Sequence, residues 1–200
     1  MTEELELLDW KRRVFELYAD VRAGAAEPAQ AWQRWRAGRD ELFRTHPQSP
    51  LLLKARETFA GLPYFPYEPA LRLLAEVEPA EAETRDIAGS AGSVTRFRRF
   101  ARAHFDGGVL ELYWLEGYGG GVFLPYRDAT SGGETYGGGR YLLDTVKGAD
   151  LGTHDSLLVL DFNFAYNPSC SYDPRWACPL TPPANRLSFE VRAGERMLAG

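Results

Sequence analysis

The chain has 200 residues, 44% of them hydrophobic, which fits a globular protein with a buried core and excludes a disordered chain. Its formal net charge is −5. This argues against a nucleic-acid-binding module, because such modules are normally basic. No window reaches the roughly 18 apolar residues that a membrane span needs, and the acidic N-terminus is unlike a secretory leader. We therefore expect a cytoplasmic protein with no nucleic-acid or membrane partner, in an oligomeric state that the sequence does not indicate.

The first 61 residues are predicted to be mainly helical. Apolar residues within 7–21 recur at steps of three and four, the period of one helix face, and Gly24 is a suitable stop. Pro28 fits the first turn of a second helix, which should end before Pro47. The pattern therefore predicts a helical hairpin at the start of the chain.

A short third helix and then a β-rich region are predicted to follow. The third helix should begin with Ser49 as N-cap and Pro50 in its first turn, and it should stop at Gly61. After the proline–aromatic segment GLPYFPYEP, residues 61–69, the apolar period changes to two, which is typical of strands. The strand-like segments are LRLLAEV, VTRFRRFARAHF, VLELYWLE, VFLPYR, RYLLDTV, SLLVLDFNF and LSFEVRA.

Seven or eight strands without intervening helices predict an antiparallel meander. Such a meander should be rolled into a β-barrel or packed as a β-sandwich. The fold class is thus α+β, in a single domain of residues 1–200. Its helical part, residues 1–61, is expected to pack on a β part, residues 62–200, because an isolated helical hairpin would leave its apolar face in water.

A polar loop at residues 126–143 is the first candidate for a functional site. Glycines 137–139 permit positive φ and a close backbone approach, and their N–H groups beside Arg140 could form an anion-binding nest. The loop is neither a P-loop nor a dinucleotide-binding fingerprint. The alternative is a glycine-rich loop in which Arg140 pairs with its own Asp128 or Glu134.

The second candidate is the segment 161–187, which opens with Asp161 at the end of the apolar run SLLVLD. Asn163 follows two residues later, so in an extended strand the two side chains would share a face. Asp161 could orient a substrate, or it could cap the strand. We expect Asp161 and Asn163 to meet the loop around Arg140.

Cys170 and Cys178 are separated by seven residues, which is not the spacing of a zinc ribbon or a thioredoxin motif. A tetrahedral zinc site would need two further ligands from His46, His104 or His154, and these lie far away in sequence. A local disulfide and a pair of buried thiols both stay open, although a disulfide would be unusual in a reducing cytosol. We expect no metal and no cofactor.

Two other features favour structural roles. The tract RFRRFAR could bind single-stranded nucleic acid, but in a chain of net charge −5 a solvated strand face explains it better. His104 and His154 could each act as a general base, although a surface or core position is the commoner case.

Two blocks resemble a known protein family. FLPYRDATSGGETYGGGRYLL and LDFNFAYNPSCSYDPRWACPLTPPANRLSFEVRAGE are similar to the signature of a bacterial and archaeal family, domain of unknown function 1684. RDELFRTHPQSPLL and FAGLPYFPYEP resemble its opening. The resemblance covers most of the chain and implies no particular activity. Its motif positions correspond here to Asp128, Thr130, Glu134, Tyr136, Arg140, Tyr141, Asp161, Asn163, Tyr166, Asn167, Cys170, Tyr172, Cys178, Pro179, Asn185 and Gly194.

The sequence supports two hypotheses about function. In the first, the loops 126–143 and 161–187 build a polar pocket of a binding protein or enzyme, and Arg140 binds an anionic small molecule. The candidate catalytic residues are Asp128, Glu134 and Asp161, and the candidate ligand-binding residues are Arg140, Tyr136, Asn163, Asn167 and Tyr141. In the second, the domain is structural or partner-binding, and the same residues form a buried hydrogen-bond network.

Overall fold

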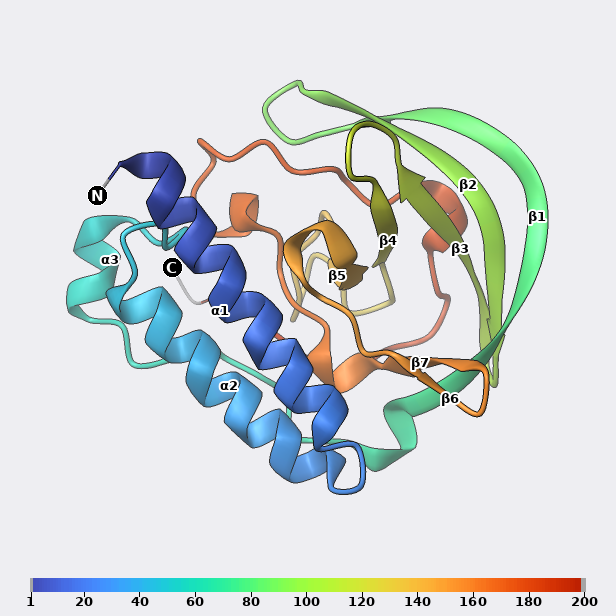
Figure 1. Ribbon diagram of the computed structural model, residues 1–200, viewed down its shortest axis with the longest axis horizontal. Coiled ribbons are helices and arrows are strands. Elements are labelled where there is room, and N and C mark those ends of the chain that lie inside the picture. Colours follow the sequence, from blue (N-terminus) through green and yellow to red (C-terminus); the bar gives the residue numbers. More distant parts are fainter. Residues whose placement is uncertain (1, 199–200) are drawn as a thin grey trace.

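The computed structural model describes residues 2–198. The helices are α1 (Glu3–Ala23), α2 (Pro28–Thr45) and α3 (Leu53–Glu57). The strands are β1 (Arg72–Ala88), β2 (Val94–Phe105), β3 (Gly108–Leu115), β4 (Gly121–Tyr126), β5 (Arg140–Asp144), β6 (Thr153–His154) and β7 (Leu157–Asp161). Figure 1 shows α1 and α2 side by side on one side of the molecule and the long, curved β1 and β2 on the other.

The end of α1 and both ends of α2 lie where their sequence signals predict. Gly24 follows the last residue of α1, and its N–H donates a hydrogen bond to Asp20 O. Pro28 occupies the first turn of α2, where a missing N–H costs no helical hydrogen bond, and α2 ends at Thr45, before Pro47. No helix within residues 2–198 combines the length and the apolar character that a membrane crossing requires.

The predicted start of the third helix is wrong. α3 begins at Leu53, after the Ser49–Pro50 pair. The Ser49 hydroxyl donates a hydrogen bond to Phe43 O at 2.7 Å and accepts one from the N–H of Leu51. Ser49 therefore satisfies a carbonyl in the last turns of α2 and does not cap α3.

The seven strands form one antiparallel sheet in the order β5-β4-β3-β2-β1-β7-β6. This confirms the α+β class and the antiparallel meander. The sheet is open, with β5 and β6 as its edges, so it is not closed into a barrel. β1 is long enough to pair with β2 over most of its length and with β7 through residues 72–75.

The segment LSFEVRA, residues 187–193, was expected to be a strand and is irregular instead. The backbone carbonyls of Val191 and Ala193 accept hydrogen bonds from the Arg140 guanidinium. A side chain thus satisfies the backbone groups that a neighbouring strand would otherwise pair.

One hydrophobic cluster joins the helices to the sheet. Trp32 and Trp35 of α2 are buried in it, as their helical spacing indicates, together with Leu110 and Leu160 of the sheet. The Trp35 ring meets Phe164 edge to face, with 5.1 Å between the centroids. Burial of large aromatic rings is the main term that holds the helices on the sheet.

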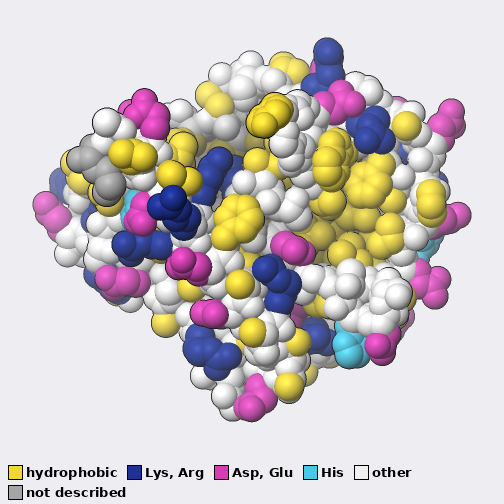
Figure 2. Space-filling view, in the orientation of Figure 1, with side chains coloured by type: hydrophobic (Ala, Val, Ile, Leu, Met, Phe, Trp, Pro, Cys, Tyr) yellow, Lys and Arg dark blue, Asp and Glu magenta, His cyan; other side chains and the backbone are white. Residues whose placement is uncertain are grey.

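A second, smaller cluster lies on the strands away from α2. Figure 2 shows apolar side chains gathered in the hollow of the curved sheet. A cavity of about 180 Å³ lies on β2, β3 and β4, where it is lined by Phe97, Leu115 and Phe123. Phe97 and Phe123 are stacked, with 4.9 Å between their centroids.

The run of glycines before Arg140 includes one position, Gly139, where a side chain would not fit. Its φ is +97°, and an added Cβ would lie 2.0 Å from Thr181 Oγ1 and 2.7 Å from Tyr126 O. Gly139 therefore lets the backbone of the loop lie close to Thr181 and Tyr126 of the protein itself. We expect Gly139→Ala to lower the free energy of unfolding by about 3 kcal/mol, measured by urea denaturation.

Gly132→Ala is the matched control for this substitution. Gly132 lies in the same loop with φ +90°, but a Cβ there would meet nothing within 4 Å. Only the backbone strain, about 1 kcal/mol, should be lost. Equal losses in the two variants would mean that the contact with Thr181 and Tyr126 has no energetic effect.

Candidate functional site

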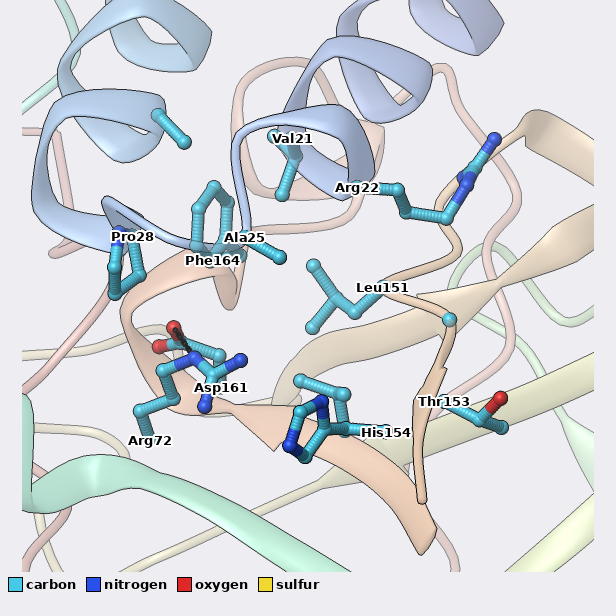
Figure 3. A pocket seen from close by; sticks show the side chains of 13 residues that line it. Val21, Arg22, Ala25, Pro28, Arg72, Leu151, Thr153, His154, Asp161 and Phe164 are labelled. Carbon is cyan, nitrogen blue, oxygen red and sulfur yellow. Dashed lines mark ion pairs between the residues drawn. The ribbon is translucent and has the colours of Figure 1, made fainter. Parts of the chain in front are cut away.

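A cavity of about 320 Å³ lies between the α1–α2 connection and the β6–β7 hairpin. Figure 3 shows the residues that line it. Val21, Leu151 and Phe164 contribute apolar walls, and the polar groups come from Arg22, Arg72, His154 and Asp161. An apolar cavity with a few convergent polar groups is the usual form of a small-molecule site.

The helical wall of the cavity follows from the tight α1–α2 connection. α1 ends before Gly24 and α2 begins at Pro28, so Ala25 and Pro28 are held over the cavity. Ala31, in the first turn of α2, also lines it. The first turn of α2 carries a partial positive charge, but the last turn of α1, which contributes Val21 and Arg22, carries a partial negative charge, so the two helix ends largely offset each other.

Asp161 is the most deeply buried polar side chain of the cavity, with 1% of its surface exposed. Its Oδ1 accepts hydrogen bonds from the N–H of Asn163 at 3.0 Å and from Asn163 Nδ2 at 2.8 Å. The Tyr67 hydroxyl lies 3.5 Å from Oδ2. Burial raises the pKa of Asp161 to about 6, although these donors and Arg72 lower it.

Arg72 reaches Asp161 through the pairing of β1 with β7. The two residues lie directly opposite each other in the antiparallel ladder, and Arg72 Nε is 3.8 Å from Asp161 Oδ2. Figure 3 shows this ion pair on the floor of the cavity, with the imidazole of His154 beside it. The His154 side chain is 62% exposed, so it belongs to the rim.

Asn163 positions Asp161 and is itself fully engaged. Its Nδ2 also donates to Glu68 O at 2.9 Å, its Oδ1 accepts from the N–H of Glu68 at 2.8 Å, and its backbone O accepts from Trp32 Nε1 at 2.8 Å. The strand ends at Asp161 and a 3-10 turn begins at Phe162. The two side chains therefore meet through a local turn, and not through the strand alternation that the sequence suggested.

Asp128 and Arg140 form a buried ion pair elsewhere, with 2.8 Å between Asp128 Oδ2 and Arg140 Nη2. Arg140 also donates to the carbonyls of Val191, at 2.9 Å, and Ala193. Asp128 Oδ1 accepts from the N–H of Thr130 at 2.7 Å and from its hydroxyl at 2.6 Å. Through these hydrogen bonds the ion pair holds residues 191–193 of the C-terminal segment in place, and we call the pair the buried clamp.

The expected meeting of Asp161 and Asn163 with the loop around Arg140 is wrong. Asp161 and Asn163 bond to residues 67–72, whereas Arg140 bonds to residues 191–195. The Arg140 guanidinium stacks on Tyr126, whose ring in turn meets Phe162 edge to face at 5.0 Å. The two polar groups are thus separate clusters.

The other candidate residues lie in three further places. Glu134 pairs with an arginine of the C-terminal segment at 3.2 Å, on the surface. The Tyr136 hydroxyl lies 3.6 Å from Cys170 Sγ. Tyr141 and Asn167 line another cavity, of about 80 Å³. Of the candidate residues, Asp161 is the one that lines the 320 Å³ cavity, and Asn163 supports it.

The sequence did not single out Arg22 or Arg72, and it favoured a structural role for His154. Arg72 had a weak signal, because it stands on the polar side of an alternating strand. Its partner lies far along the chain, and only the pairing of β1 with β7 brings the two together. Within residues 2–198, no group of three or more His, Cys, Asp or Glu side chains is arranged to hold a metal ion.

Comparison with known proteins supports the resemblance noted in the sequence. The model of the family described as protein of unknown function (DUF1684) matches residues 57–196. The chain belongs to this family. The match includes Arg72, His154 and Asp161, whereas Arg22 and the α1–α2 wall precede it.

A solved structure is similar to this DUF1684 protein. It is the solution NMR structure of an uncharacterized protein of Haloarcula marismortui, which is 36% identical, with a TM-score of 0.57. The similarity covers 82% of this chain and 91% of that chain. A search of curated proteins found no match. The comparisons thus assign the family and support the fold, and the proposal for function rests on the site itself.

Proposed function

We propose that this DUF1684 protein binds a small anionic molecule with an apolar part in the cavity beside Asp161, and that Arg72 holds the anionic group. The observation that carries the proposal is the position of a buried carboxylate and a guanidinium, 3.8 Å apart, on the wall of a cavity of about 320 Å³. A cavity of this size falls at the lower end of the range typical of ligand sites.

The charges at the cavity favour an anion once Asp161 is protonated. Arg22 and Arg72 line the cavity, and each has a carboxylate close by: Asp150 Oδ2 lies 3.6 Å from Arg22 Nη1, and Asp161 Oδ2 lies 3.8 Å from Arg72 Nε. Arg22 stands at the mouth, where its Nη1 donates to Asp150 O at 2.7 Å. Protonation of Asp161 removes the counter-ion of Arg72 and leaves one positive charge unpaired at the cavity. Anion binding and protonation of Asp161 should therefore strengthen each other.

Asp161 is also the residue to which we assign any proton transfer in this cavity. A carboxyl group with a pKa of about 6 exchanges its proton readily near neutral pH, which suits a general acid or base. Perturbed carboxyl groups in cavities are frequent at active sites. The apolar wall, including Val21, Leu151 and Phe164, would hold the rest of the ligand.

The polar residues of the loop 126–143 support the second hypothesis for their own part of the molecule. Asp128 and Arg140 are bonded to each other and to the backbone of the C-terminal segment. We propose that this pair serves the fold and takes no part in ligand binding.

The binding proposal is tested by NMR titration with hexanesulfonate, which stays ionised at all relevant pH values. We expect it to shift the amide resonances of residues 21–27 and 151–154, and to bind more tightly at pH 5.5 than at pH 7.5. Arg72→Gln should weaken binding about tenfold, because it removes a charge-assisted hydrogen bond.

Two controls make this test specific. 1-Hexanol has the same apolar chain without the charge and should bind much more weakly. Arg192→Gln removes an exposed guanidinium that pairs with Glu134, and it should leave the affinity unchanged. Equal binding of hexanol, or an unchanged affinity in Arg72→Gln, would refute the proposal.

A further inference from the structure

Cys170 and Cys178 lie together in a part of the molecule that the proposed ligand site does not use. The N–H of Cys170 donates a hydrogen bond to Cys178 Sγ at 3.4 Å. Cys170 is 9% exposed and Cys178 is 5% exposed, and both are free thiols. Cys170 itself lies in a 3-10 turn, Ser169–Ser171.

The β1–β2 connection holds Cys178 in place. The N–H of Cys178 donates to Ser90 Oγ at 2.9 Å, and the N–H of Ser90 donates to Cys178 O at 2.9 Å. Two residues further on, the N–H of Leu180 donates to Ala88 O at 3.0 Å. Cys178 is therefore a fixed partner for Cys170, and its backbone cannot move away without breaking these hydrogen bonds.

The surroundings of the two sulfur atoms differ. A hydrogen bond from the Cys178 thiol, together with the hydroxyls of Ser90 and Tyr136, lowers the pKa of Cys170 to about 6 against the effect of burial. The Tyr136 hydroxyl is 3.6 Å from Cys170 Sγ. The same contact with Cys170, and burial, raise the pKa of Cys178 well above that of an ordinary thiol. Hydrogen bonds to the charged form stabilise it, so one sulfur becomes the thiolate and the other stays protonated.

The other titratable groups near the pair do not reverse this asymmetry. The charge of Lys147 lowers the pKa of Cys178, but by less than the contact with Cys170 raises it. Tyr141 lies close enough for both cysteines to raise its own pKa, so its hydroxyl stays neutral and adds no charge. We therefore assign the thiolate to Cys170, beside the Tyr136 hydroxyl.

We propose that Cys170 and Cys178 form a redox-modification site that reacts with low-molecular-weight disulfides, with Cys170 as the attacking thiolate and Cys178 as the resolving thiol. The geometry supports a reaction between the two sulfur atoms because the N–H of Cys170 lies 3.4 Å from Cys178 Sγ, and the Tyr136 hydroxyl lies 3.6 Å from Cys170 Sγ, where it can donate to a thiolate. The proposal concerns a separate region of the molecule and does not depend on the proposed function.

The reaction with oxidised glutathione balances in two exchange steps. The Cys170 thiolate attacks one sulfur of glutathione disulfide, the S–S bond breaks, and one glutathione thiolate leaves and takes up a proton from water. Cys178 then loses its proton to water, and its sulfur attacks Cys170 Sγ in the mixed disulfide. The second glutathione thiolate leaves and is protonated. Glutathione disulfide is reduced to two thiols, and the two cysteines are oxidised to one disulfide.

The native protein tests the proposal without any substitution. It is incubated with oxidised glutathione at pH 7, remaining thiols are trapped with iodoacetamide, and the peptides are analysed by mass spectrometry. We expect an intramolecular Cys170–Cys178 disulfide, with a rise in Tm of about 5 °C. A protein that keeps both thiols after prolonged incubation would overturn the proposal.

Two single variants test the separate roles. Cys178→Ser should accumulate glutathione on Cys170, because the resolving thiol is missing. Cys170→Ser should be modified more slowly than Cys178→Ser at pH 7, because Cys178 is the more deeply buried residue and the Tyr136 hydroxyl lies beside Cys170. Equal or faster modification of Cys170→Ser would assign the attack to the wrong residue and refute the mechanism.

The pH profile of alkylation tests the hydrogen bonds to Cys170. In the native protein the rate for Cys170 should rise with a midpoint below that of an ordinary thiol, because hydrogen bonds lower the pKa of Cys170. Tyr136→Phe should raise this midpoint by about one unit and slow alkylation at pH 6.5 roughly threefold. Protein unfolded in urea is the control, in which both thiols should titrate near their ordinary pKa. A native midpoint equal to the unfolded one would contradict the proposal.

Discussion

Asp161→Asn is expected to be more stable than the wild-type protein at pH 7, by about 2 kcal/mol in the free energy of unfolding. Burial raises the pKa of Asp161 to about 6, so the folded state disfavours the carboxylate that it holds at neutral pH. Asparagine carries no charge, and its Oδ1 can still accept both hydrogen bonds that Asn163 donates.

The raised pKa of Asp161 should also make the stability of the wild-type protein depend on pH. Between about pH 4 and pH 6 the folded protein binds the Asp161 proton more tightly than the unfolded chain does. The free energy of unfolding therefore falls as the pH rises through this window, by about 3 kcal/mol for Asp161 alone. Asp161→Asn should lack this contribution, which urea denaturation at a series of pH values from 4 to 8 would measure.

The difference in the free energy of unfolding between the wild-type protein and Asp161→Asn isolates the contribution of Asp161. Burial also raises the pKa of Glu195, but Glu195 is present in both proteins and its contribution cancels. Asp106→Asn is the matched control, because Asp106 is an exposed aspartate in the turn between β2 and β3 and should have little effect. A variant less stable than the wild type at pH 7 would mean that the ion pair with Arg72 outweighs the burial of Asp161.

A stabilising Asp161→Asn substitution would agree with the proposed function. A buried charged group that lowers the stability of the fold is typical of residues that act on a ligand. The variant should bind hexanesulfonate with an affinity that no longer changes between pH 5.5 and pH 7.5. The pH dependence of stability and that of binding would then both arise from the protonation of Asp161.

Arg140→Met is expected to have the opposite effect on stability, with a loss of about 3–5 kcal/mol in the free energy of unfolding. The substitution leaves the Asp128 carboxylate buried without its counter-ion. It also leaves the carbonyls of Val191 and Ala193 without the donor that holds them. Urea denaturation at pH 7 measures the loss.

A second substitution separates the two causes. In Asp128→Asn/Arg140→Met the buried charge is gone, so the double variant should be more stable than Arg140→Met alone. Arg192→Gln, at an exposed ion pair with Glu134, should change stability by less than about 1 kcal/mol. A loss below about 1 kcal/mol in Arg140→Met would show that the buried clamp does not stabilise the fold.

The elements of the fold were predictable where the signal is local. Gly24 and Pro28 mark the α1–α2 connection because each acts on the backbone at its own position. β2 coincides with the segment VTRFRRFARAHF. The prediction failed at Ser49, whose hydroxyl bonds to a carbonyl of α2 and does not cap α3. It also failed at residues 187–193, where the distant Arg140 side chain bonds to a backbone carbonyl that a strand would have paired.

The candidate site was predictable only in part. Asp161 stood out because it ends an apolar strand, and the structure brings it to a cavity. Arg140 stood out as well, beside a run of glycines, but its guanidinium is 1% exposed and clamps the C-terminal segment. Residue type and spacing cannot distinguish these two outcomes, because they depend on which distant segment covers each side chain.

The sequence by itself determined the helical hairpin, most of the strands, the α+β class and the family, because periodicity, glycine, proline and the long motif blocks are local properties. Only the tertiary structure decided that Arg72 faces Asp161, that Asp128 neutralises Arg140, and that Cys170 touches Cys178. Each of these contacts depends on how segments far apart in the chain, or the two ends of a folded loop, are brought together. The environment so formed, buried or open to a cavity, sets whether a charged side chain serves the fold or a ligand.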